Sequence, residues 1–203
     1  MASAKIIRDP QNDHMLTPQN AALVIIDYQP VQVGSIVTMN KRLLIDNIVA
    51  VARLAKLYAL PVVLSTVNVE TGLNSPTIHQ ITDVLDEVSP IDRTAINAWE
   101  DTDFVAAVKV TGRTKLIMAA LWTEVCLVFP AIDALREGFE IFAVIDAVGG
   151  TSEEAHRAGI QRIVQAGGVP ISWVQLACEL QRDWNRTETA QEFAAIALAE
   201  VGH

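Results

Sequence analysis

Apolar runs of strand length alternate with helix-like segments along this chain, and this alternation constrains the fold more than any other feature. The runs are apolar on both faces, which is typical of strands buried inside a parallel sheet. They lie at residues 21–28, 61–67, 115–121, 140–147 and 169–174. Strand followed by helix, repeated in this way, predicts an α/β fold: a three-layer α/β/α, Rossmann-like arrangement around a central, mainly parallel sheet.

The segments between these strands have apolar residues at helical spacing and recognisable end signals. Helices are predicted at residues 41–58, 103–110, 124–137, 151–165, 175–184 and 188–201. Gly112 and Gly138 each follow a predicted helix, as a left-handed C-terminal cap favours. Thr151 with Glu154 has the pattern of a capping box that opens a helix. Residues 68–90 are less regular and predict a loop containing a short helix and a turn.

The chain is long enough for one well-packed core and shows neither a linker nor an internal repeat. Its 203 residues fit one domain. Residues 1–203 are therefore predicted to form a single domain, with 185–203 as a C-terminal helical extension. The last helix has an apolar, alanine-rich surface suited to packing against its own domain or another subunit. The apolar fraction of 51% is high for a soluble monomer, which favours a homo-oligomer.

The charge of the chain argues against two classes of partner. The formal net charge is −9, whereas nucleic acids and anionic membranes attract clustered lysine and arginine. No apolar run approaches the roughly 20 residues of a membrane-spanning helix. A small-molecule substrate or another subunit is therefore the predicted partner, with no nucleic acid and no membrane.

The N-terminal segment and the cysteine count predict a cytoplasmic location. Residues 1–16 contain no apolar stretch of the kind that secretory signal peptides have. The two cysteines, Cys126 and Cys178, are too few for a network of disulfides, so both are expected to be free thiols. His79 and His156 lack neighbours at metal-ligand spacing, and no metal or other cofactor is predicted.

Three residues are candidates for a site at the carboxyl ends of the strands, where such sheets bind ligands. Asp27 follows the first strand and can act as a general base, or it caps a loop. Cys126 lies in the predicted first turn of a helix, whose partial positive charge favours a thiolate; alternatively, it is a small buried apolar side chain. Arg93 alone is equally consistent with a surface loop.

Taken together, these residues and their surroundings resemble a known family. The segment LVIIDYQ with its strand-end aspartate, the basic residue in IDRTAINAW, and AALWTEVCLVFPAIDALREGFEIFAVIDA are similar to the isochorismatase-like cysteine hydrolases. RTAINAWEDTDF and WVQLACELQRDW resemble a branch of uncharacterised bacterial hydrolases within that family. The resemblance covers nearly the whole chain and implies the same α/β fold.

The resemblance implies a catalytic triad at Asp27, Arg93 and Cys126. The family usually has a lysine where this chain has Arg93, and a guanidinium stays protonated. Arg93 is therefore expected to stabilise charge and to orient Asp27 or the substrate. The resemblance also implies a cis peptide bond between Leu121 and Trp122, and an oxyanion hole formed by the backbone N–H groups of Trp122 and Cys126.

Five side chains near these positions are predicted to line the substrate pocket, although each is also consistent with packing. They are Gln29, Asn97, Trp99, Trp122 and Phe129. Gln29 follows the candidate base directly and is expected to orient the substrate.

The predicted function is hydrolysis of a small amide-like substrate, at a C–N bond, through a covalent thioester on Cys126. The alternative is a non-catalytic or redox-sensing thiol protein on a hydrolase scaffold. The metal-binding residues of the nicotinamidase branch have no counterpart in residues 65–80, which argues against a nicotinamidase. No G-x-G-x-x-G motif follows the first strand, which argues against a dinucleotide-binding domain. Because members of the family are usually oligomers, the resemblance also implies a homo-oligomer.

Overall fold

The computed structural model describes residues 8–198 of the chain. Its centre is a six-stranded sheet with the order β3-β2-β1-β4-β5-β6, in which every neighbouring pair is parallel. The strands are β1 (Ala21–Ile26), β2 (Val62–Val67), β3 (Ile91–Arg93), β4 (Lys115–Ala120), β5 (Glu140–Val144) and β6 (Val169–Ile171).

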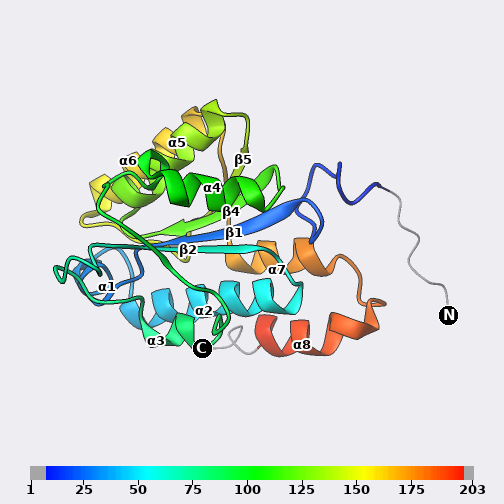
Figure 1. The fold of residues 1–203 in the computed structure, drawn as a ribbon. Coiled ribbons are helices and arrows are strands. Elements are labelled where there is room, and N and C mark those ends of the chain that lie inside the picture. The colour runs from blue at the N-terminus through cyan, green and yellow to red at the C-terminus, as the bar shows by residue number, and fades with distance from the viewer. Residues whose placement is uncertain (1–7, 199–203) are drawn as a thin grey trace.

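Helices cover both faces of the sheet (Figure 1). One face carries α4 (Thr102–Val110), α5 (Val128–Arg136) and α6 (Glu153–Gln165). The other carries α1 (Pro30–Ser35), α2 (Lys41–Leu57), α3 (His79–Thr82) and α7 (Trp173–Gln181), with α8 (Thr187–Ala197) against α2. The predicted three-layer α/β/α fold is confirmed.

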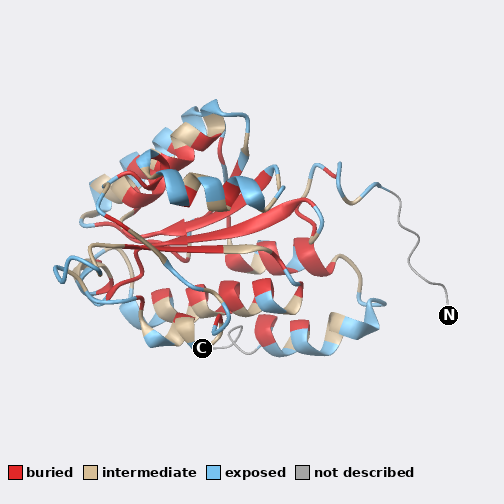
Figure 2. Cartoon of the chain, in the orientation of Figure 1, coloured by how far each residue is buried: buried red, intermediate tan, exposed pale blue. Residues whose placement is uncertain are grey.

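The order of the strands reverses between β1 and β4. After β1 the chain builds β2 and β3 on one side, and it then returns to build β4, β5 and β6 on the other. Both central strands are fully buried (Figure 2), and Ile26 at the end of β1 pairs with Ala120 at the end of β4. In parallel sheets, ligands bind beyond the carboxyl ends of the strands at such a reversal. Asp27 and the segment leading to Cys126 both begin there.

Several predicted elements differ from those observed; the predicted strand 140–147 ends at Val144, and the predicted helix 175–184 spans Trp173–Gln181. The predicted turn at Pro90 is followed at once by β3, an edge strand too short to show periodicity. The predicted helix 124–137 is divided into a π-helix at Thr123–Leu127 and α5. The predicted strand 169–174 stops at Ile171, because the Ser172 side chain accepts a hydrogen bond from Gln175 N and thereby caps α7.

The capping box predicted at Thr151 is also wrong in detail. The residue that caps α6 is Ser152, whose hydroxyl accepts from the backbone N–H of Ala155 at 3.1 Å. Thr151 instead donates both its N–H and its hydroxyl to Glu124, at 2.9 Å and 2.6 Å. This contact joins the loop before α6 to the π-helix that carries Cys126.

The C-terminal helix α8 packs on the outer side of α2. Arg53 of α2 forms an ion pair with Glu192 of α8 at 2.8 Å, and Phe193 contacts the ring of Trp184 edge-on. The predicted helix 188–201 ends at Ala197, and residues 199–203 lie outside the described part of the chain. Among residues 8–198, no helix has both the length and the apolar character needed to cross a membrane.

Candidate active site

Asp27 follows β1 and turns the chain out of the sheet. Its φ is 62°, in the left-handed region that aspartate tolerates better than most residues. Its backbone N–H donates to Ser65 O of β2 at 3.0 Å, so the residue stays attached to the sheet. The side chain is fully buried at the point where the strand order reverses. A buried carboxylate requires a charged or hydrogen-bonding partner.

Arg93 is that partner. It lies on β3 and reaches across β2, so that Nη1 and Nη2 each donate to one oxygen of Asp27 at 2.7 Å. Nη1 also donates to Thr66 O at 2.9 Å. Burial acts to lower the pKa of Arg93, but the hydrogen bonds and charge of Asp27 outweigh it, and the pKa lies above its ordinary value. Arg93 is thus a permanently charged residue of the site and not a surface side chain.

Cys126 is the fourth residue of the π-helix at Thr123–Leu127, and it is 8% exposed. The carbonyl of Trp122 accepts from both Val125 N and Leu127 N, which widens the turn around the cysteine. Cys126 therefore lies before α5 and not in its first turn.

The surroundings of Cys126 oppose the thiolate that a helix N-terminus would favour. Burial raises the pKa of the Cys126 thiol well above its ordinary value, and Asp27 raises it further by its charge and as a hydrogen-bond acceptor. Arg93 and the backbone N–H of Trp122 lower it, but by less. Arg93 is already paired with Asp27, and the negative charge of that carboxylate opposes the effect of the guanidinium on the thiol. The surroundings of Cys126 therefore favour the thiol over the thiolate.

Trp122 connects β4 to the π-helix. The peptide bond between Leu121 and Trp122 is cis. The indole N–H donates to the Ser35 hydroxyl of α1 at 2.6 Å, and the side chain is partly buried against the core. Trp122 directly precedes the π-helix that carries Cys126, and its backbone acts to lower the pKa of the Cys126 thiol.

Gln29 is fully buried and holds a loop. Its side-chain amide donates to Val67 O at 3.1 Å and to Ser75 O at 2.6 Å, and its carbonyl accepts from Val67 N at 3.0 Å. Both amide hydrogens are used by the backbone. The predicted substrate-orienting role is therefore replaced by the positioning of residues 67–75.

Asn97 and Trp99 also serve the scaffold. The side-chain amide of Asn97 donates to Asp133 of α5 at 2.8 Å, while its carbonyl accepts from Trp99 N. The Trp99 indole donates to Glu137 at 2.8 Å and packs edge-on against aromatic rings on either side. These contacts fasten the segment after Arg93 to α5.

Phe129 is partly buried, with the guanidinium of Arg162 over its ring at 5.9 Å. It lies on α5, three residues beyond Cys126. Of the five predicted pocket residues, Trp122 and Phe129 remain candidates for the wall of the site.

Sequence reasoning missed two polar residues that support the pair of Asp27 and Arg93. The Ser65 hydroxyl lies 3.3 Å from Arg93 Nη1 and donates to Ile91 O. Asp92 accepts from Thr66 Oγ1, Val69 N and Glu70 N, and these bonds outweigh burial and lower its pKa. In the sequence, these contacts could have been suspected from Ser65 and Thr66, two polar residues inside the otherwise apolar segment 62–67.

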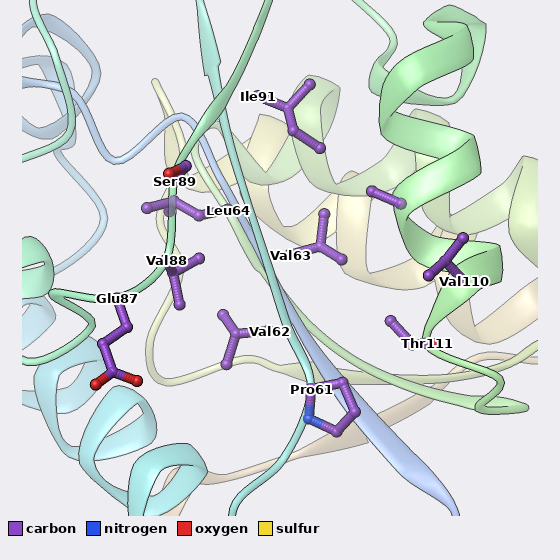
Figure 3. A pocket seen from close by; sticks show the side chains of 11 residues that line it. Pro61, Val62, Val63, Leu64, Glu87, Val88, Ser89, Ile91, Val110 and Thr111 are labelled. Carbon is purple, nitrogen blue, oxygen red and sulfur yellow. The ribbon is translucent and has the colours of Figure 1, made fainter.

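An apolar groove of about 590 Å³ opens elsewhere on the molecule (Figure 3). The first half of β2, the segment around Val88 and the C-terminal end of α4 line it, with Val110 on its rim. None of Asp27, Arg93 and Cys126 contributes to it. In residues 8–198, no cluster of three or more His, Cys, Asp or Glu side chains is arranged to hold a metal ion.

Comparisons with known proteins show the family to which the chain belongs. Residues 21–175 match the isochorismatase domain. The chain is 38% identical over 170 residues to the probable hydrolase YcaC of Escherichia coli K12, covering 83% of this chain and 81% of that protein.

Two solved structures share the fold closely. YcaC from Pseudomonas aeruginosa, solved with hexane-2,5-diol and covalent acrylamide, has a TM-score of 0.85 at 34% identity over 92% of this chain and 93% of that one. The Escherichia coli YcaC product, described as an octameric hydrolase of unknown specificity, has a TM-score of 0.81 at 33% identity, covering 92% and 96%. The chain therefore belongs to the isochorismatase family, within which it is a probable hydrolase.

Proposed function

We propose that this protein is a cysteine hydrolase that cleaves a C–N bond of a small amide-like substrate through a thioester on Cys126. The observation that carries the proposal is the position of the Cys126 thiol beside the buried pair of Asp27 and Arg93. A nucleophile next to a base that a third group orients is the arrangement common to covalent hydrolases.

The raised pKa of Cys126 determines the order of events. Because the resting cysteine is a thiol, it must lose its proton as it attacks. Asp27 accepts that proton while Sγ bonds to the substrate carbonyl carbon. The negative charge that develops on the carbonyl oxygen is stabilised by the backbone N–H groups of Trp122 and Cys126.

Collapse of the tetrahedral intermediate breaks the C–N bond. The proton held by Asp27 passes to the leaving nitrogen, which departs as an amine or ammonia. A water molecule then loses a proton to Asp27 and attacks the thioester. When the S–C bond breaks, that proton returns to Cys126 and a carboxylic acid is released.

Arg93 serves this cycle without transferring a proton. Its two hydrogen bonds fix both oxygens of Asp27, and its charge compensates the carboxylate in a buried site. When Asp27 is protonated, Arg93 remains charged and favours return of the proton. An arginine is therefore compatible with turnover in the place where the family usually has lysine.

The same observation argues against a redox-sensing role. Sensor cysteines are accessible and have a low pKa, whereas Cys126 is buried and its pKa is raised.

We further infer a homo-oligomer, since the 33% identical Escherichia coli relative is octameric. Several apolar side chains of the described residues are exposed, among them Val110 and Trp184, and can be buried by a second copy.

A screen of primary amides, carbamoyl compounds and nitriles, measured by ammonia release, tests the proposed activity. Wild-type protein and Cys178→Ala should release ammonia from at least one compound, and Cys126→Ala should release none. Turnover that survives in Cys126→Ala would refute the assignment of the nucleophile.

A further inference from the structure

The turn that carries Cys126 is fastened to α6 and to the loop before it by side chains that the proposed mechanism does not use. Thr123 is fully buried, and its Oγ1 lies 2.9 Å from Nδ1 of His156 on α6. Its backbone N–H donates to Gly149 O at 2.9 Å. The next residue, Glu124, accepts two hydrogen bonds from Thr151. Both residues at the start of the turn are thus held from the same side.

The backbone in this region comes unusually close. A Cβ atom at Gly159 would lie 3.1 Å from Glu124 Cα and 3.2 Å from Thr123 Cγ2. At Gly150 a Cβ would lie 2.6 Å from Glu124 Oε2 and 2.9 Å from His156 Cβ. A side chain at either position would force a neighbouring group to move, so α6 and its preceding loop lie directly against the Cys126 turn. A change in the contact between Thr123 and His156 is therefore transmitted to the turn.

The protonation state of His156 sets the direction of this hydrogen bond. Burial lowers the pKa of His156 below its ordinary value, although the charges of Glu124 and Glu153 oppose this effect. At neutral pH the ring is neutral, and its Nδ1 can accept from the Thr123 hydroxyl. Glu124 on the turn and Glu153 on α6 are the charged groups that act on the ring. When the ring gains a proton, Nδ1 becomes a donor and the Thr123 hydroxyl oxygen can accept from it, so the contact persists with its direction reversed.

We propose that His156 is a positioning residue that, through Thr123, holds the Cys126 turn in its reactive geometry. This inference rests on the proposed role of Cys126 as the nucleophile. His156 does not contact the reacting atoms. It acts on the turn that carries Cys126 through its hydrogen bond with Thr123.

The test uses acrylamide as the probe and the exposed Cys178 as the internal reference within each sample. The alkylation rate of each cysteine is measured by peptide mass spectrometry in the full-length protein. Thr123→Val and His156→Phe should each slow alkylation of Cys126 about tenfold, as expected for loss of one buried hydrogen bond. Thr123→Ser and His156→Gln keep a hydroxyl and an acceptor, respectively, and should restore most of the rate. His79→Gln, at an exposed histidine, should change nothing.

Two further readouts separate positioning from general loss of structure. The double variant Thr123→Val/His156→Phe should react no more slowly than either single variant, because both remove the same contact. The ratio of the wild-type rate to the His156→Phe rate should stay well above one between about pH 6 and about pH 8, because the hydrogen bond with Thr123 can form in either protonation state of the ring. Because both proteins contain the same thiol, its ionisation affects both rates alike and does not change their ratio.

The proposal is overturned if the single variants react like wild type, if their effects simply add, or if the rate ratio falls to one within that pH range. These outcomes are independent of hydrolysis. A wild-type protein that shows the predicted coupling but forms no acyl adduct would refute the proposed function and leave the positioning contact intact.

Discussion

Arg93 reaches across β2 to hold both carboxylate oxygens of Asp27 at 2.7 Å, and both side chains are fully buried. The pair joins the edge strand β3 to the end of the central strand β1. Removing one partner of such a pair leaves an isolated charge, whose burial costs far more than the intact pair. The pair therefore stabilises the fold, and in the proposed mechanism it also provides the general base.

Replacement of Arg93 by methionine should lower the free energy of unfolding by about 3 to 5 kcal/mol, because Asp27 is left uncompensated. Urea unfolding measures this directly. Arg93→Lys keeps one charge but loses the second hydrogen bond, and it should lose less stability. Arg42→Met is the matched control, because Arg42 is exposed beside Asp46 and should lose about 0.5 kcal/mol or less. Equal losses in Arg93→Met and Arg42→Met would show that the buried pair carries no special cost.

Alkylation of Cys126 should increase with pH without a plateau. Because burial and Asp27 raise the pKa of the thiol, its thiolate fraction is small at neutral pH and rises about tenfold per pH unit between about pH 7 and about pH 9. Stopped-time labelling with iodoacetamide, resolved by peptide mass, measures this rate. A rate that is already constant at pH 7 would mean a preformed thiolate and would contradict the described order of proton transfer.

Gln29→Leu should destabilise the protein by about 1 to 3 kcal/mol, because it leaves the backbone groups of Val67 and Ser75 without their partner. Limited proteolysis should then cut residues 67–75 faster. Gln161→Leu, on the exposed side of α6, serves as the control and should match wild type. A Gln29→Leu protein with unchanged stability and a changed KM would restore the substrate-binding role predicted from the sequence.

Light scattering should give a mass several times the 22.1 kDa of the chain. A single species of about that mass, across a wide range of protein concentration, would argue that the octameric assembly of the Escherichia coli relative is not shared.

The sequence predicted the parts of the site that depend on local pattern. Asp27 and Cys126 follow long apolar strands, and strand ends in a parallel sheet meet at one edge. A local pattern could not show that Arg93 pairs with Asp27, because β3 has only three residues and the contact spans 66 positions of the chain.

Side-chain roles were the least predictable part of the site. Gln29 lies next to Asp27, yet its amide points to the backbone of residues 67–75. The effect of the surroundings on the Cys126 thiol was hard to predict for a related reason. The position after a strand suggested a helix N-terminus, whereas burial and the neighbouring carboxylate dominate its pKa. Such effects depend on tertiary contacts that no local pattern contains.

The central claim is that Cys126 forms a covalent acyl intermediate. Intact-mass and peptide mass spectrometry during reaction with p-nitrophenyl acetate tests it most directly. Wild-type protein and Cys178→Ala should each gain one acetyl group on Cys126, which is lost again as the thioester hydrolyses, while Cys126→Ala gains none. An acetyl group that accumulates on Cys178, or no acyl group on Cys126 while the ester is turned over, would contradict the account.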